Sequence, residues 1–213
     1  MQANTGIVKT GFEIDLNPST LYQMSETEKA RFEEESERMR ELNAQSNALD
    51  EYIFLIDRSY SMSGTFINLA KEALMLFIQS LPYGSRFNVV SYGSSHQFLF
   101  EGERSVQYDD QTVTHAINEI KQFDANLGGT EIYNPLEEIF KKPVADEVHN
   151  SHIYLLTDGA VLNAEKVIDL IKNNCTGKSR LHTFGIGSGA DERLIKGCAF
   201  SGKGNFSFIY QPE

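Results

Sequence analysis

The stretch Tyr52-Ile53-Phe54-Leu55-Ile56-Asp57 decides the fold. A continuous apolar run of this kind, ending in a charged residue, is typical of a strand that is buried on both faces of a parallel sheet. A second run, residues 153–157, has the same character and is followed by Asp158-Gly159. We therefore expect these two runs to be central strands of one sheet.

Strand and helix patterns alternate around these two runs. Further strands are predicted at residues 87–92, 181–186 and 206–210, and an antiparallel edge strand at 96–100. Helices are predicted at residues 66–81, 112–123, 136–140, 164–172 and 192–198, with Pro135 in a first turn and Asn163 as an N-cap. The alternation predicts an α/β fold with a doubly wound, mostly parallel sheet of about six strands, helices on both faces and one antiparallel edge strand.

Residues 1–50 differ in composition from the rest of the chain. Residues 7–16 have the pattern of a short strand or an extended arm, and Ser25 with Glu28 has the spacing of a capping box. A helix is predicted at residues 27–49, with few apolar positions. We interpret residues 1–50 as an N-terminal arm and connector helix, a linker from a preceding domain, and residues 51–213 as the folded domain.

Composition excludes several classes of protein. The formal net charge of −11 repels phosphate backbones, so nucleic acid is not an expected partner. The sequence has no apolar run near the roughly 20 residues that cross a bilayer, and no signal peptide is visible. This predicts a cytoplasmic protein without membrane insertion, or a secreted one if the chain is an excised domain. Cys175 and Cys198 fit no zinc signature or disulfide framework, and we expect two buried or partly buried thiols.

Polar side chains follow the two central strands, at the carboxyl edge of the sheet where doubly wound folds bind ligands. Asp57 ends the first strand, and Ser59 and Ser61 follow it at alternate positions. Asp158 follows the second strand, and Thr130, after two glycines that permit close approach, offers a third hydroxyl. Because these ligands are hard oxygens, the set favours Mg²⁺, with Mn²⁺ or Ca²⁺ as alternatives, over zinc.

A charge count indicates what such a metal would bind. Two carboxylates formally balance a divalent cation, and hydroxyl ligands add no charge. If one aspartate acts only through water, the metal stays electron-poor and favours a negative ligand from outside. An Asp or Glu carboxylate of a partner protein fits that requirement.

The order of these residues resembles the metal-ion-dependent adhesion site of von Willebrand factor A domains. Asp57-Arg58-Ser59-Tyr60-Ser61 matches the family's D-x-S-x-S motif, Thr130 its separate threonine and Asp158 its second aspartate. The resemblance covers about residues 51–210 and is greatest to A domains that follow a VIT domain, as in inter-α-trypsin-inhibitor heavy chains and related intracellular proteins. It implies direct metal contact from Ser59 and Ser61, contact through water from Asp57, and exchange between the two modes at Thr130 and Asp158.

Four residues beside the motif form a possible ligand rim: Arg58, Tyr60, Gly129 and Gly159. Arg58 could shield the aspartates or contact the partner's acid, and Tyr60 could line the rim. For both residues, an exposed loop side chain without a role is the favoured interpretation.

The predicted function is metal-dependent protein binding without catalysis, within a longer multidomain protein. The alternative is a metal-independent scaffold domain in a larger intracellular complex. Enzyme motifs are missing: the sequence has no phosphate-binding P-loop and no G-x-S-x-G elbow, and Ser59 stands where a haloacid dehalogenase-type phosphatase carries an acid. His149 and His152 have a helical ligand spacing but fall at a loop–strand junction, so a second metal site is not favoured. His152 and His182 are expected to be hydrogen-bonded core histidines.

Overall fold

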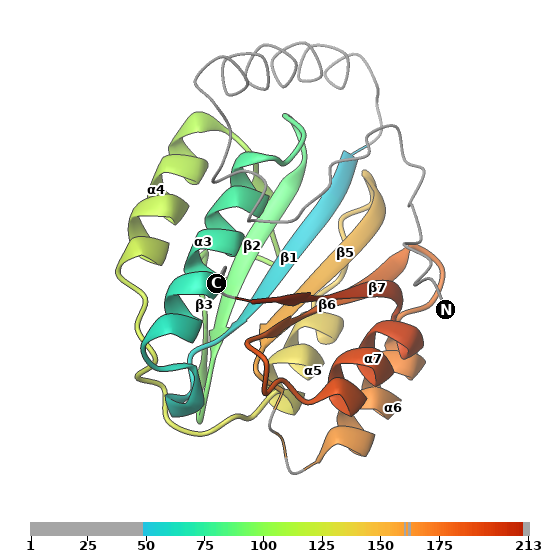
Figure 1. Cartoon of the computed structure of the whole chain (residues 1–213). Helices are drawn as coiled ribbons and strands as arrows, with labels where there is room; N and C mark the ends of the chain where they lie inside the picture. The colour runs from blue at the N-terminus through green and yellow to red at the C-terminus, as the bar shows by residue number, and fades with distance from the viewer. Residues whose placement is uncertain (1–48, 160, 162, 211–213) are drawn as a thin grey trace, which may run out of the picture.

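A seven-stranded sheet forms the centre of the structure, with helices on both of its faces (Figure 1). The computed structural model describes residues 49–159, 161 and 163–210. The predicted arm at 7–16, the Ser25–Glu28 capping box and all but the last residue of the helix predicted at 27–49 lie outside the described residues. The strands are β1 (Leu49–Asp57), β2 (Arg86–Tyr92), β3 (His96–Phe98), β4 (Val106–Gln107), β5 (Val148–Thr157), β6 (Ser179–Ile186) and β7 (Lys203–Ile209).

The sheet order β3-β2-β1-β5-β6-β7 confirms the doubly wound, mostly parallel architecture. Strands β2, β1, β5, β6 and β7 run parallel, whereas β3 and β4 both pair antiparallel with β2. The edge strand predicted at 96–100 is confirmed as β3. The sheet has one strand more than the six that were predicted, namely the two-residue strand β4. The chain moves from β1 to β2 on one side and later enters β5 on the other, so the carboxyl ends of β1 and β5 flank the switch point where such folds bind ligands.

Five helices, preceded by a short 3₁₀ turn, cover the sheet within the described residues. The 3₁₀ turn is η1 (Tyr60–Met62), and the five helices are α3 (Thr65–Gln79), α4 (Asp110–Lys121), α5 (Tyr133–Lys141), α6 (Ala164–Asn174) and α7 (Glu192–Ser201). Helices α3 and α4 lie on one face and α5, α6 and α7 on the other (Figure 1).

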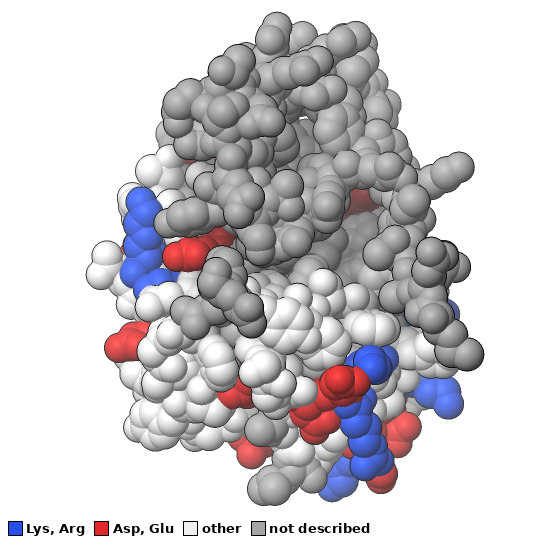
Figure 2. Space-filling view, viewed as in Figure 1, with Lys and Arg blue, Asp and Glu red and all other residues white. Residues whose placement is uncertain are grey.

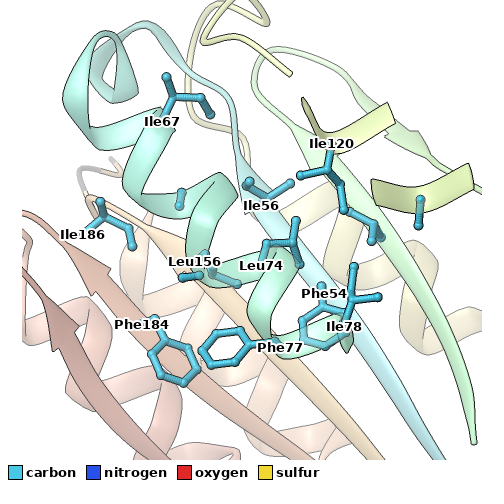
Figure 3. Close-up of a cluster of buried hydrophobic side chains, with 14 of the residues drawn as sticks. Phe54, Ile56, Ile67, Leu74, Phe77, Ile78, Ile120, Leu156, Phe184 and Ile186 are labelled. Carbon is cyan, nitrogen blue, oxygen red and sulfur yellow. The ribbon is translucent and has the colours of Figure 1, made fainter. Parts of the chain in front are cut away.

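Alternate side chains of β1 enter two separate cores. Phe54 and Ile56 pack with Leu74 and Phe77 of α3 and with Phe184 of β6 (Figure 3). Ile53 and Leu55 point to the opposite face, where they belong to the core shared with α5, α6 and α7. Because each large buried side chain stabilises the fold by roughly 1.5–3 kcal/mol, β1 is anchored on both faces. Its carboxyl end is therefore a rigid position for Asp57.

Local capping explains where two helices begin. Helix α4 starts at Asp110, two residues before its predicted start, because the Asp109 carboxylate accepts from the backbone N–H groups of Gln111 and Thr112. Helix α6 starts as predicted after Asn163, but the expectation of a side-chain cap is wrong, since Asn163 makes no capping hydrogen bond.

Strand β1 begins at Leu49, so residues 49 and 50, which we assigned to the connector, pair with β5 instead. The buried Glu51 continues the strand because its carboxylate is fully paired. It accepts from Arg104 Nε at 2.8 Å, from Ser151 Oγ at 2.7 Å and from Ser105 Oγ at 2.6 Å. Because these partners of Glu51 are distant in sequence, hydrophobic periodicity gives no sign of them. A prediction from periodicity alone therefore starts the strand too late.

His152 and His182 lie on β5 and β6 as predicted and are joined to each other. His152 Nδ1 and His182 Nε2 are 3.4 Å apart, and the Asn205 backbone N–H donates to His182 Nδ1 at 3.1 Å. The His182 ring stacks on Tyr154, with centroids 4.9 Å apart. His149 is exposed at the start of β5, where the pairing with β1 passes from Val148 to Asn150 and skips it.

We expect His182 to make stability depend on pH. Burial, which is the largest cause, acts together with the neighbouring His152 and Arg180 to lower the pKa of His182 from 6.5 to about 4. The unfolded chain therefore binds a proton at higher pH than the folded one. The contribution of His182 to the free energy of unfolding is fully present above pH 6.5 and is lost as the pH falls toward 4. Because the ring is partly exposed, we expect this loss to be on the order of 2 kcal/mol.

The measurement is the free energy of unfolding by urea at several pH values between 7 and 4. His182→Phe, which keeps an aromatic ring, should give a shallower slope than the wild type. His149→Phe removes an exposed histidine and serves as the matched control. Identical slopes for His182→Phe and the wild type would contradict the assignment.

The two cysteines are free, fully buried thiols, as expected. Burial raises the pKa of Cys175 to about 11 and that of Cys198 to about 12. None of the helices described has both the length and the apolar character needed to cross a bilayer.

Candidate metal centre

Asp57, at the end of β1, is fully buried and held by three donors. Its Oδ1 accepts from the Ser59 backbone N–H at 2.8 Å, and its Oδ2 accepts from Thr157 Oγ at 2.6 Å and from the Tyr92 hydroxyl at 3.3 Å. Burial raises the pKa of Asp57, the hydrogen bonds oppose this, and the Asp158 carboxylate adds to the increase. A positive charge at this position would favour the ionised form.

The two serines of the motif lie together just after Asp57. Ser59 is buried and Ser61 is exposed, and their hydroxyl oxygens are 3.0 Å apart. Between them, Tyr60 turns its side chain to solvent, with 70% of it exposed. The loop is fixed from its other side because the Tyr60 backbone N–H donates to the Gly128 carbonyl at 2.9 Å.

The segment that carries Thr130 is hydrogen-bonded to the Asp57 loop and to the end of β2. The Leu127 N–H donates to the Arg58 carbonyl at 3.0 Å, and the Gly129 N–H donates to Ser94 Oγ at 2.8 Å. Thr130 itself is half-buried. Within the described part of the chain, no hydrogen bond joins its hydroxyl to the other four candidate residues. The backbone hydrogen bonds of Leu127 and Gly129 are what hold the segment of Thr130 in this region.

Asp158 presents an unsatisfied oxygen. The residue is only 9% exposed, and its Oδ1 is the one buried side-chain oxygen or nitrogen without a hydrogen-bond partner among the residues that the structure describes. The Asp158 carbonyl accepts from the Asp191 N–H at 3.0 Å. Gly159 is buried with φ 83°, and its N–H donates to Thr157 Oγ at 2.9 Å. The Thr157 hydroxyl thus connects the Asp158 turn with Asp57.

The expectation for Arg58 is wrong, because this side chain is buried rather than exposed on the loop. Its Nε donates to the Asp124 carbonyl at 2.9 Å and its Nη2 to Asn126 Oδ1 at 2.8 Å. The guanidinium carbon lies 4.5 Å from the centre of the Phe123 ring. Arg58 therefore turns away from the motif and ties the Asp57 loop to residues 123–126.

Sequence reasoning missed the residues that support the motif. Thr157 and Tyr92 hold Asp57, while Gly93 and Ser94 at the end of β2 bind the segment that carries Thr130. Both residues could have been found as polar side chains at the ends of buried strands, because Thr157 and Tyr92 lie at the same edge of the sheet as the two aspartates. The described residues contain no group of three or more His, Cys, Asp or Glu side chains arranged to hold a metal, so any cation here would depend on hydroxyl ligands.

The fold agrees with the comparison to known proteins. The sequence profile of the von Willebrand factor type A domain matches residues 50–208. Human von Willebrand factor A domain-containing protein 5A is 39% identical over 173 residues, covering 77% of this chain and 22% of that protein. The mouse protein 5B1 is 37% identical over 163 residues, covering 76% and 13%. The chain belongs to the von Willebrand factor type A domain family, and it spans only 13–22% of the length of these relatives.

Solved structures share the fold at low sequence identity. The von Willebrand factor type A protein from Catenulispora acidiphila has a TM-score of 0.65 at 23% identity, over 78% of this chain and 39% of that one. Proximal thread matrix protein 1 from the mussel byssus, with a zinc-occupied MIDAS motif, has a TM-score of 0.61 at 18% identity, over 76% and 41%. The manganese-loaded TRAP protein of Plasmodium vivax has a TM-score of 0.57 at 19% identity, over 77% and 69%.

Proposed function

We propose that this domain is a metal-ion-dependent protein-binding module, in which one divalent cation coordinates an acidic side chain of a partner protein. The observation that carries the proposal is the buried, unpartnered Oδ1 of Asp158. A carboxylate oxygen that is removed from water without a partner costs several kcal/mol unless a cation or a proton compensates it. A cation at this edge would satisfy that oxygen and also favour the ionised form of the buried Asp57.

The five residues that would hold the cation are Asp57, Ser59, Ser61, Thr130 and Asp158. Their hard oxygen donors suit Mg²⁺ first, with Mn²⁺ or Ca²⁺ as alternatives. When bound, the cation supplies a positive centre that accepts one more oxygen from outside. Thr157 and Tyr92 hold the Asp57 carboxylate in place, while the hydroxyl donors add no charge and leave the centre attractive to an acid.

Two of the similar structures support the choice of a metal site, since one is described as manganese-loaded and the other as having a zinc-occupied MIDAS motif. Their identity to this chain is below 20%, so this support is an analogy between folds. We further propose that the domain follows a VIT domain in a larger cytoplasmic protein and that it does not catalyse a reaction.

Mg²⁺ should raise the melting temperature of the protein. At a concentration 100 times its Kd, a ligand that binds only the folded state adds about 2.7 kcal/mol, which is roughly 5–10 °C for a domain of this size. Differential scanning fluorimetry with Mg²⁺, Mn²⁺ and Ca²⁺ measures the shift. Asp158→Ala should remove it, and Ser61→Ala, a milder change in an exposed residue, should reduce it.

Asp169→Ala, which removes an exposed carboxylate from α6, is the matched control and should keep the full shift. A wild type that shows no shift with any of the three ions would refute the proposal. Partner capture in Mg²⁺ and in EDTA separates the proposal from the alternative, because a metal-independent scaffold retains its partner in EDTA.

A further inference from the structure

Strand β7 lies at one edge of the sheet and carries exposed aromatic side chains (Figure 1). Among the described residues, no strand pairs with its outer side, and its seven residues make it longer than β3, which has three residues at the opposite edge. Phe206 is 48% exposed, Phe208 is half-buried, and Tyr210, directly after the strand, is 53% exposed. A long edge strand with apolar side chains is a template for pairing with a further strand.

The three rings form one row on the side of the sheet that faces α7. Phe206 pairs with Thr183, whose hydroxyl donates to the Ile195 carbonyl of α7 at 2.7 Å. The centroids of neighbouring rings in the row Phe206, Phe208 and Tyr210 are 6.2 Å apart. In Figure 2 the surface over the middle of β7 is white, and charged side chains gather over α6 and α7. Alternate apolar side chains of one added strand could cover this row.

The backbone groups of the same residues point away from the sheet. Ile209 faces β6, because its carbonyl accepts from the Gly187 N–H at 2.9 Å. Backbone N–H and C=O groups alternate in direction along a strand, so those of Ser207 also face β6, whereas those of Phe206 and Phe208 face outward. An added strand would therefore pair with the backbone of the residues whose rings it covers.

The other face of this edge is positively charged. His182 of β6 stacks on Tyr154, which packs against the core beneath α3, and Arg180 lies on the same face two residues earlier. Neither Arg180 nor the exposed Lys203 at the start of β7 forms an ion pair with a described residue. Residues 193–212 contain no Asp or Glu, although the formal net charge of the chain is −11. A suitable occupant is therefore apolar on one face and acidic on the other.

Residues 12–16 of this chain have that pattern. Phe12, Ile14 and Leu16 alternate with Glu13 and Asp15, which is the two-residue period of a strand. A glycine precedes the run and an Asn-Pro pair follows it, and both favour turns. The run belongs to the predicted arm, which lies outside the described residues.

We propose that residues 12–16 add an antiparallel strand to the outer side of β7. A register with Ile14 opposite Phe208 aligns the three apolar side chains of the segment with the three rings. The two acids of the segment then lie on the face that carries Arg180. A second copy of β7 would be a poorer occupant, because two edges that hold Lys203 and no acid repel each other.

The connection between the segment and the sheet is long enough for this pairing. Strand β1 begins at the same edge of the sheet as β7 and is three strand positions from it, about 14 Å. Residues 17–48 would span about 48 Å even if they were entirely helical. The antiparallel direction brings Leu16 to the amino end of β7, so the connection to β1 does not cross the sheet.

Amide hydrogen exchange, followed by NMR on the full chain, tests the pairing. In the wild type the outward N–H groups of Phe206 and Phe208 should be protected. Ile14→Asp should raise their exchange rates about tenfold or more, because the added strand is lost. The N–H groups of Ser207 and Ile209 are bonded to β6 in either case and should change little.

Leu21→Asp makes the same kind of change outside the proposed strand and is the matched control. It should leave the exchange of all four N–H groups as in the wild type. Unchanged protection of Ser207 and Ile209 in both variants also shows that the domain remains folded.

A spin label identifies the direction of the strand and the chain that supplies it. Attached at Asn17→Cys, where the two buried native cysteines do not compete, it should broaden the amide signal of Gly204 more than that of Ile209. Unlabelled wild-type chains mixed in excess with the spin-labelled, ¹⁵N-enriched protein should leave this broadening unchanged. Spin-labelled protein mixed with ¹⁵N-enriched wild type should cause none.

Three results would overturn the proposal. Free exchange of the Phe206 and Phe208 N–H groups in the wild type would show that the edge is open. Protection that persists in Ile14→Asp would show that something else covers β7. Broadening of the ¹⁵N-enriched wild type by separate spin-labelled chains would show that the strand comes from a second copy.

Discussion

Arg104→Met is expected to lower the free energy of unfolding by about 3–5 kcal/mol, because it leaves the carboxylate of Glu51 buried without its charge partner. Glu51 is fully buried and Arg104 is 8% exposed. The guanidinium also donates to the carbonyls of Ile139 and Lys142 at the end of α5. One substitution therefore removes both a charge pair and the hydrogen-bond donors of two backbone carbonyls.

Urea unfolding at neutral pH measures this change. The control is Arg193→Met, which breaks an exposed pair with Glu165 and should change stability by no more than about 0.5 kcal/mol. Adding Glu51→Gln to Arg104→Met should restore part of the loss, since the buried charge disappears. A double variant that is less stable than Arg104→Met would show that the buried charge is not the source of the cost.

Gly93→Ala is expected to destabilise the domain by about 3 kcal/mol or more and to weaken metal binding as well. A methyl group at this position would lie 2.7 Å from the carbonyl carbon of Leu127, a backbone atom that no side-chain rotation can move away. The Gly93 carbonyl also accepts from the Glu131 N–H at 2.9 Å. Displacing this contact would shift the segment that carries Thr130.

Gly189→Ala provides the matched control, because a methyl group there would meet no atom within 4 Å. It should leave the melting temperature and the response to Mg²⁺ near those of the wild type. Both variants are compared by thermal melting with and without Mg²⁺. Should Gly93→Ala melt and respond like Gly189→Ala, the close approach of Gly93 to Leu127 would not determine the geometry of the site.

Much of the fold could be predicted because its signals are local. The apolar runs of β1 and β5 predict central strands without information from the rest of the chain, and helical periodicity predicts α3. Boundaries were less certain where the stabilising partner is distant. Glu51 belongs to β1 only because Arg104 neutralises it, and the two residues of β4 form a strand only because they pair with Arg86 and Phe87.

The candidate site was predictable as a set of residue types but not as a geometry. The motif located Asp57 and Asp158 at neighbouring strand ends, since parallel strands bring their carboxyl ends to one edge. It gave no information about the direction of Arg58, which depends on contacts with residues more than 60 positions later. The roles of Thr157 and Tyr92 also depend on lateral pairing, because each reaches Asp57 from a different neighbouring strand.

The burial of both cysteines has a practical consequence for following this domain in solution. Cys175 and Cys198 are inaccessible, and their thiols resist ionisation, so neither should react readily with maleimides while the protein is folded. A single cysteine introduced at the exposed Ser63, just after the motif, would then be the selective attachment point for a fluorophore. A reporter group can therefore be attached beside the candidate metal centre without first replacing the two native cysteines.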